Sequence, residues 1–272
     1  MTACPAPSPT QERSFGAAHV ALLAGPNGGR LDRLHQKGSA KAFLHPGPSG
    51  PEIVLLNTSG GLTGGDRLSY RLDLAAGCRA TGTTQTAERA YRSPGEAARV
   101  TVHHRVASGA HLDWLPQETI LFDGSHLDRE TTIDLAQEAS CLILESIVLG
   151  RAAMGETVTR TTLRDTRRIT RDGKPVLIEP LHLTTEALTA GPAILNGARA
   201  FATLALVAQG AEDAAPRIQD LLDEPGVTGG ASGFDGKLVI RLMAGDGWPL
   251  RRQIMRLVSA LRPGPLPRVW QN

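Results

Sequence analysis

The chain has 272 residues, including 30 Gly and 18 Pro, so about 18% of its positions are residues that turn the backbone, against about 12% in an ordinary protein. This frequency argues against a long helical bundle, because Gly and Pro are the least favourable residues inside a helix. The formal net charge of +2 gives no electrostatic case for binding nucleic acid. No apolar run reaches the ~20 residues that cross a bilayer. The composition instead suits a chain of many strands and turns.

The N-terminal sequence has no basic segment followed by an apolar one, so no signal peptide is expected. Three scattered cysteines, Cys4, Cys78 and Cys141, fit a reducing compartment better than a disulfide framework. These features predict a cytoplasmic protein. Residues 1–14 are polar and Pro-rich and are expected to form a disordered lead-in. Residues 15–272 contain no clear linker, so we expect a single β-rich domain there.

Short strands separated by turn residues are predicted along most of the chain. In residues 67–74 polar and apolar side chains alternate strictly, which puts Leu68, Tyr70, Leu72 and Leu74 on one face. Further strands are predicted over 52–58, 100–106, 110–114, 140–149, 174–179 and 237–242. Residues 157–171 carry Thr and Arg in near alternation, which is typical of a strand pair with one solvated face or a hairpin at a sheet edge.

Two helices are predicted late in the chain. Residues 213–223 begin with acidic side chains and an early Pro216, and they stop before Pro225. Residues 250–262 carry an apolar stripe at helical spacing and end before a proline. Residues 192–208 stay ambiguous, because they are rich enough in Ala for a helix but contain glycine and β-branched residues that allow a strand.

The densest motif is the glycine-rich segment 57–66, with the sequence NTSGGLTGGD. It is not a phosphate loop, because Asp66 and Arg67 stand where such a loop needs Lys followed by Ser or Thr. It is not a dinucleotide fingerprint, since its glycines are paired and a strand follows. Four glycines between two predicted strands favour a tight crossing with positive-φ positions. Asp66 at its end is a candidate ligand or polar anchor.

Other motifs for catalysis or metal binding are absent from the sequence. The histidines form no H-E-x-x-H pattern, no paired C-x-x-C motif is present, and the adjacent His103 and His104 would face opposite sides of a strand. The G-x-S-x-G nucleophile motif is broken at its last position in residues 230–234. The residues therefore predict neither a closed zinc site nor an activated nucleophile.

Acidic residues inside apolar β segments are the most unusual feature of the sequence. Glu145 interrupts one long apolar segment, and Glu179 closes another. A buried carboxylate is costly unless it is paired, bound to a metal or facing water. Two interpretations stay open. One is an internal ion pair with Arg89, Arg151 or Arg160, and the other is a polar, cation-favouring lining of an internal cavity or channel.

An ordered set of motifs resembles the UreD (UreH) family of urease accessory proteins. The motifs are NTSGG and GGD in 57–66, TTQTAERAYR in 83–92, WLPQETILF in 114–122, LGR and GE in 149–156, GAS in 230–232, LRP in 261–263 and PRVW in 267–270. They occur in family order and cover most of residues 15–270.

The resemblance implies a mainly β, β-helix-like protein of stacked sheets with a small helical part near its C-terminal end. It implies a non-catalytic scaffold or chaperone that docks on the urease apoprotein and binds UreF, which recruits the GTPase UreG. Such an assembly delivers nickel to the urease active site, with nickel in transit through an internal tunnel and no tightly bound cofactor. No role with nucleic acid or membranes is implied.

The resemblance also names candidate residues. Acidic residues in a β body are what a nickel tunnel needs, which makes Asp66, Glu145, Glu179, Glu88 and Glu156 the candidates for its lining. No fixed set of metal ligands follows from the sequence.

Near the C-terminus, Leu257 and Leu261 either pack in the core or contact UreF. Trp270, if exposed, would suit an anchor at that interface.

Two hypotheses from other classes compete with the scaffold. A β-helical hydrolase would use paired carboxylates that converge on one open groove within about 10 Å, whereas a tunnel would string its carboxylates along a buried path. A plain interaction module would have all its acidic groups in ion pairs, and it would tolerate the loss of Asp66 and Glu179.

Overall fold

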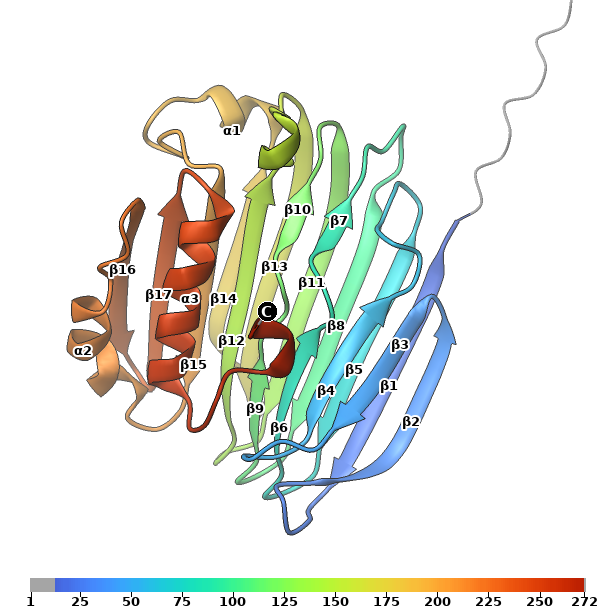
Figure 1. The fold of residues 1–272 in the computed structure, drawn as a ribbon. Helices are drawn as coiled ribbons and strands as arrows, with labels where there is room; N and C mark the ends of the chain where they lie inside the picture. Colours follow the sequence, from blue (N-terminus) through green and yellow to red (C-terminus); the bar gives the residue numbers. More distant parts are fainter. Residues whose placement is uncertain (1–12, 272) are drawn as a thin grey trace, which may run out of the picture.

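Two stacked β-sheets make up most of the molecule in the computed structural model, which describes residues 13–271 (Figure 1). The seven-stranded sheet contains, in spatial order, β14 (Lys174–Leu183), β13 (Thr161–Arg171), β11 (Ser125–Leu135), β8 (Ala98–Val106), β5 (Arg67–Leu74), β1 (Phe15–Leu23) and β2 (Arg30–Gly38). The ten-stranded sheet contains β16 (Val227–Phe234), β17 (Lys237–Ala244), β15 (Ala200–Val207), β12 (Ser140–Leu149), β9 (His111–Trp114), β6 (Arg79–Thr84), β4 (Glu52–Asn57) and β3 (Ala40–His45). The short β10 (Thr119–Leu121) pairs with β12, and β7 (Glu88–Ala90) pairs with β10.

The chain passes back and forth between the two sheets, so that successive coils stack on one another. Strands β4, β6, β9 and β12 are parallel neighbours in the ten-stranded sheet. Strands β5, β8, β11 and β13, which follow them in the chain, are parallel neighbours in the seven-stranded sheet. The result is about four turns of a β-solenoid, so the β-helix-like fold that the resemblance implied is confirmed.

Aliphatic side chains fill most of the space between the sheets, because alternate residues of each strand point inward. In β5 the inward residues are Leu68, Tyr70, Leu72 and Leu74, as the alternation predicted, and all four are buried. Of the adjacent histidines in β8, His104 is fully buried between the sheets and His103 is partly exposed on the outer face.

The small helical part packs on the outer face of the ten-stranded sheet. Helix α3 (Gly247–Leu261) lies over β15 and β17 (Figure 1). Asp246 caps its first turn, because its carboxylate accepts a hydrogen bond from the backbone N–H of Trp248 at 2.8 Å. The other helical segments are α1 (Thr185–Thr189), α2 (Ala215–Asp220) and the 3-10 turns η1 (Ala152–Met154), η2 (Ala211–Ala214) and η3 (Arg268–Trp270).

Three predicted elements differ from the structure. Residues 157–171 do not form a strand pair by themselves: residues 161–171 form the single strand β13, which pairs with β11 on one side and with the edge strand β14 on the other. Residues 192–208 resolve into a loop followed by β15, which lies between β12 and β17, so sheet pairing outweighs the helical propensity of alanine. The predicted helix 213–223 is a 3-10 turn followed by the six-residue α2.

The glycine-rich segment crosses from β4 to β5, and Gly60, Gly61 and Gly65 adopt positive φ, as predicted. Most of the predicted lead-in lies outside the described residues. No helix within residues 13–271 is both long enough and apolar enough to cross a membrane.

Candidate functional site

Charged side chains gather between the sheets near β14 and β17, where strand register brings them together. In the seven-stranded sheet Arg129 lies beside Asp165, and Arg167 beside Glu179. In the ten-stranded sheet, Glu145 of β12 faces these four residues. Glu145 is paired in register with Thr203 of β15, and Thr203 is paired with Arg241 of β17. We call the four acidic side chains of this region, Glu88, Glu145, Asp165 and Glu179, the carboxylate row.

Arg129 is the centre of the row. Its guanidinium forms ion pairs with Glu145 at 2.9 Å and with Asp165 at 2.8 Å, and it donates a hydrogen bond to the Thr119 hydroxyl at 3.0 Å. Glu145 comes from one sheet and Asp165 from the other, so Arg129 joins the two sheets through charge. All three charged residues are buried.

Glu179 is the outer end of the row, on the edge strand β14. Its carboxylate forms an ion pair with Arg241 at 2.9 Å and a longer one with Arg167 at 3.7 Å, and it accepts a hydrogen bond from Thr203 at 3.4 Å. The Arg241 side chain is 65% exposed, whereas that of Glu179 is 11% exposed. The row therefore reaches solvent at this end.

Glu88 is the opposite end of the row, at the start of β7. Its carboxylate accepts hydrogen bonds from the Asn57 side chain at 3.3 and 3.4 Å, and Asn57 opens the glycine-rich segment. Burial raises the pKa of Glu88 to about 7, and the bonds from Asn57 and the charge of Arg129 only partly oppose that rise. Glu88 is therefore a carboxyl group that changes charge near neutral pH.

The pKa values of the two carboxyl groups on Arg129 are shifted in opposite directions. Burial raises the pKa of Glu145, and attraction to Arg129 opposes the rise without cancelling it. Burial acts in the same direction on Asp165, but the charge of Arg129 and the hydrogen bonds from it outweigh burial and lower the pKa. One guanidinium thus keeps Asp165 ionised, while Glu145 is the carboxyl group that more readily accepts a proton.

Three cavities follow the row and share lining residues. The first, of about 430 Å³, opens at the β14 edge and is lined by Glu179, Asp165 and Glu145 among others. The second, of about 40 Å³, lies between the sheets and shares Glu145 with the first. The third, also about 40 Å³, shares Glu88 and Tyr70 with the second and reaches the glycine-rich segment. The carboxylates are therefore strung along consecutive cavities.

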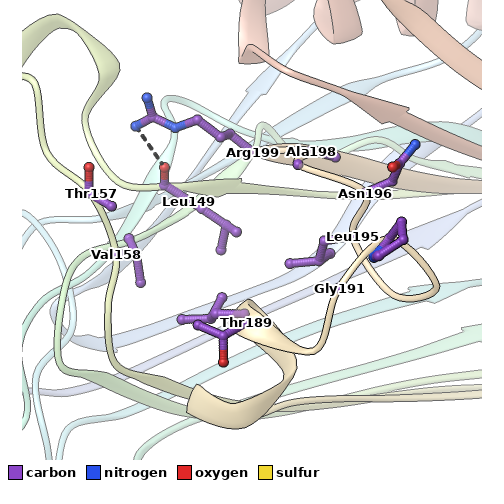
Figure 2. Close-up of a pocket in the computed structure, with 12 residues that line it drawn as sticks. Leu149, Thr157, Val158, Thr189, Gly191, Leu195, Asn196, Ala198 and Arg199 are labelled. Atoms are coloured by element: carbon purple, nitrogen blue, oxygen red, sulfur yellow. Dashed lines mark hydrogen bonds between the residues drawn. The ribbon is translucent and has the colours of Figure 1, made fainter.

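A further cavity, of about 490 Å³, lies at the end of β12 beside α1 (Figure 2). None of its lining residues is acidic. Its one charged side chain, Arg199, donates hydrogen bonds to the backbone carbonyls of Leu149 at 3.3 Å and Glu156 at 2.7 Å. This cavity is therefore separate in chemistry from the carboxylate row.

Two of the predicted acidic candidates lie apart from the row. The Asp66 carboxylate accepts hydrogen bonds from the backbone N–H groups of Ser14 at 2.7 Å and Thr63 at 2.8 Å, so it is a polar anchor of the glycine-rich segment. Glu156 forms an ion pair with Arg151 at 2.8 Å in the loop after β12. Neither lines any of the three cavities.

The predicted partner-binding residues lie mostly in the core. Leu257 is fully buried, Leu261 is partly buried, and both pack in the cluster that joins α3 to the ten-stranded sheet. Trp270 does not meet the condition of exposure that was set for an interface anchor, because only 2% of it is accessible. Its indole N–H donates to the Leu115 carbonyl at 3.1 Å, and the guanidinium of Arg251 stacks on its ring. This packing leaves Leu257 and Trp270 almost no accessible surface.

The predicted site residues did not include Asp165 or the cations of the row. The predicted ion pair of Glu145 with Arg89, Arg151 or Arg160 is also wrong, since Glu145 pairs with Arg129. The missing signal is periodicity, because Arg129 falls in phase with the inward residues of β11, and Asp165 and Arg167 with those of β13. A charge in phase with a buried stripe marks an internal polar position.

The arrangement bears on the competing hydrolase. Glu145 and Asp165 also line the cavity that opens at the β14 edge, but both carboxylates are buried and pair with one guanidinium, which is not the arrangement of a free acid and base on either side of a bound polymer. Within residues 13–271, no three His, Cys, Asp or Glu side chains are grouped so as to hold a metal ion. The geometry favours a buried polar path over paired catalytic carboxylates.

Comparison with known proteins identifies the family. The family model described as UreD urease accessory protein matches residues 15–271. A urease accessory protein UreD from Cereibacter sphaeroides is 59% identical over 100% of both chains. One from Paracoccus denitrificans is 54% identical over 96% of this chain and 93% of its own, and one from Rhizobium leguminosarum is 44% identical over 95% and 96%. The chain therefore belongs to the UreD family of urease accessory proteins.

Proposed function

We propose that this protein is a non-catalytic scaffold in urease maturation, which docks on the urease apoprotein with UreF and UreG and passes nickel along the carboxylate row. Family membership supports the role in urease maturation. The observation that carries the nickel path is the run of acidic residues through three cavities that share lining residues. Cys78 and Cys141 are buried free thiols, which suits the cytoplasmic location that we propose.

The chemistry of the row suits a cation in transit. Carboxylate oxygens bind divalent cations, but a site with few ligands holds them weakly. Glu145 and Glu179 are each shared with a guanidinium, so nickel must compete with Arg129 and Arg241 at these two positions. Such competition favours exchange over retention. Glu179 at the open edge, Glu145 in the middle and Glu88 at the far end would act as successive weak ligands.

Because Leu257 and Trp270 are buried, the contact that we propose for UreF is a surface near α3. A groove of about 330 Å³ lies between the loop after β12 and the start of α3, and apolar side chains such as Val148, Leu250 and Ile254 line it. Trp248 borders the groove and is 56% exposed. An exposed tryptophan beside an apolar groove is a typical interface anchor. This proposal keeps the C-terminal region as the UreF side of the molecule.

Co-purification tests the scaffold role. Urease subunits, UreF and UreG are produced together with or without this chain, and urease is then isolated and its nickel content measured. We expect a complex that contains this chain, urease and UreF, and nickel-poor urease when the chain is left out. If urease and UreF never co-purify with the chain, the scaffold role is wrong. If the complex forms and urease is loaded equally well without the chain, only the nickel role fails.

A further inference from the structure

The outer face of the seven-stranded sheet carries an ordered array of basic side chains. Strand register groups its outward residues into four rows, which we call the basic face. The first row is Phe15, Arg67, Arg99, Asp128, Arg164 and His182. The second is Lys37, Ala17, Ser69, Thr101, Glu130, Thr166 and Pro180.

The third row is His35, His19, Arg71, His103, Thr132, Arg168 and Ile178. The fourth is Arg33, Ala21, Asp73, Arg105, Asp134, Thr170 and Pro175. The four rows hold eight Lys or Arg residues against four Asp or Glu residues, and four histidines. The positive excess of this one face exceeds the +2 of the whole chain.

Most arginines of the basic face have no internal ion pair. Five of them, Arg67, Arg99, Arg105, Arg164 and Arg168, are exposed. Among the residues described, none of the five has a carboxylate within 4.0 Å. Arg67 and Arg99 are direct neighbours across two strands. Like charges in that position destabilise a sheet, so the free protein carries a repulsion that an acidic partner would relieve.

Two carboxylates of the face are already engaged within it. Asp73 is paired with Arg71 at 2.9 Å and with His19 at 2.8 Å. Asp134 is paired with His103 at 2.7 Å and accepts a hydrogen bond from Thr170 at 2.9 Å. Burial would raise the pKa of both, but these bonds outweigh it and lower the pKa. Asp73 and Asp134 are therefore engaged within the face, and the charge of Arg105 also acts on Asp134. Asp128 lies in register between Arg99 and Arg164, but no ion pair within 4.0 Å joins these residues in the described part of the chain, so the five arginines can still bind an external anion.

We propose that the basic face is a docking surface for an acidic, folded protein. Six strand spacings of about 4.8 Å and four rows about 6.6 Å apart span roughly 29 by 20 Å, or about 600 Å². That area approaches the ~800 Å² that each partner buries in a standard interface. The carboxylates between the arginines would repel a phosphate backbone, but they can match the scattered cations of a protein surface. An acidic protein is therefore favoured over nucleic acid.

Variants that replace three arginines with neutral glutamines, either on the basic face or elsewhere, test the proposal. The face variant is R99Q/R164Q/R168Q. The matched control is R79Q/R160Q/R217Q, which removes three exposed arginines elsewhere. Binding of a fluorescent poly-glutamate peptide of about 20 residues is measured by anisotropy between about 0.05 and 0.3 M salt. A double-stranded DNA of similar charge is measured in parallel. Circular dichroism and the melting temperature establish that each variant is folded.

The face variant should bind poly-glutamate at least about tenfold more weakly than the parent and lose most of the salt dependence, whereas the control should stay within about twofold. Binding to DNA should be weaker than binding to poly-glutamate. An equal loss of affinity in the face variant and the control variant would mean that net charge, and not this face, determines binding. That result would overturn the proposal. Tighter binding to DNA would overturn the choice of an acidic protein. If the triple variant does not fold, R99Q/R168Q is judged by the same outcomes.

Discussion

The space between the two sheets has two ends that differ in chemistry, although the same coils form both. Where β5 and β8 face β6 and β9, the space is filled mainly by aliphatic side chains such as Leu72, Leu112 and Val106. Where β11, β13 and β14 face β12, β15 and β17, it holds Glu145, Asp165 and Glu179 of the carboxylate row with their arginines, and Glu88 lies where the second cavity passes between the two regions. A regular solenoid can therefore carry a polar path along one end while the other end supplies the stability.

Buried titratable groups show the contrast most clearly. His104 lies in the apolar end, where burial and the neighbouring His103 lower its pKa to about 3 and keep the ring neutral. Its Nδ1 accepts a hydrogen bond from the Leu72 backbone N–H at 3.1 Å, and its ring packs against Trp114. Glu88, in the carboxylate row, has a pKa of about 7. Of these two buried groups, only Glu88 has a pKa near neutral.

The largest effect is expected when Arg129 loses its charge. The variant Arg129→Met leaves Glu145 and Asp165 buried without their guanidinium, which should lower the free energy of unfolding by about 3–5 kcal/mol at pH 7. Leu72→Ala in the apolar end should cost a similar 2–5 kcal/mol or so through cavity formation. Urea denaturation measures both losses.

The pH dependence separates these two variants. In the parent, the lowered pKa of Asp165 gives stability that is lost as pH falls through it. In Arg129→Met, burial raises the pKa of both carboxyl groups, so stability rises as pH falls through the raised values. The loss of unfolding free energy relative to the parent should therefore become smaller toward acid pH for Arg129→Met, whereas for Leu72→Ala it should be the same at every pH. A loss independent of pH in both would show that Arg129 acts by packing alone.

A smaller effect, of opposite sign, is expected at Glu88. Its folded pKa of about 7 lies above the ordinary 4.5, so the folded state holds a proton that the unfolded state has released. Stability therefore falls as pH rises between these values and is level above them. Glu88→Gln should be more stable than the parent by about 1–2 kcal/mol above pH 7, and equal to it below about pH 4. Thermal melts across this pH range measure both stabilities. A difference between Glu88→Gln and the parent that stayed the same at every pH would contradict the raised pKa of Glu88.

The smallest effect is expected at Asp66, which lies apart from the row. Its two oxygens accept from two backbone N–H groups, and asparagine can accept only one of these bonds without turning its NH₂ group toward the other donor. Asp66→Asn should therefore cost about 1 kcal/mol of stability and leave the nickel content of urease unchanged. A loss of nickel without a loss of stability would return Asp66 to the path.

The strands were predictable because alternation and turn residues are local signals. The segment 67–74 was assigned as a strand with the bounds that β5 has. The assignment of 192–208 stayed open and that of 157–171 was wrong in detail, since both depend on neighbouring strands distant in sequence. The burial of Trp270 stayed open for the same reason: its partners, Leu115 and Arg251, are set by tertiary packing.

The candidate site was predictable only in part. Glu145 and Glu179 stood out because a charge interrupts a continuous apolar segment. Arg129, Asp165 and Arg167 lie in strands that alternate polar and apolar residues, so their inward direction shows only when the phase of each strand is known. Glu156 and Asp66 met the same sequence criterion as Glu88, an acidic residue next to a family motif, yet they anchor loops.

Nickel loading of urease tests the carboxylate row most directly. The row variant Glu145→Gln/Glu179→Gln is compared with the matched control Glu156→Gln, each produced with urease, UreF and UreG. Metal analysis of the purified urease should show about a tenfold loss of nickel for the row variant, by analogy with the loss of a metal ligand's support. The control should load normally, and both should co-purify with urease as well as the parent does. Full nickel content with the row variant, at equal co-purification, would contradict a path through the carboxylate row.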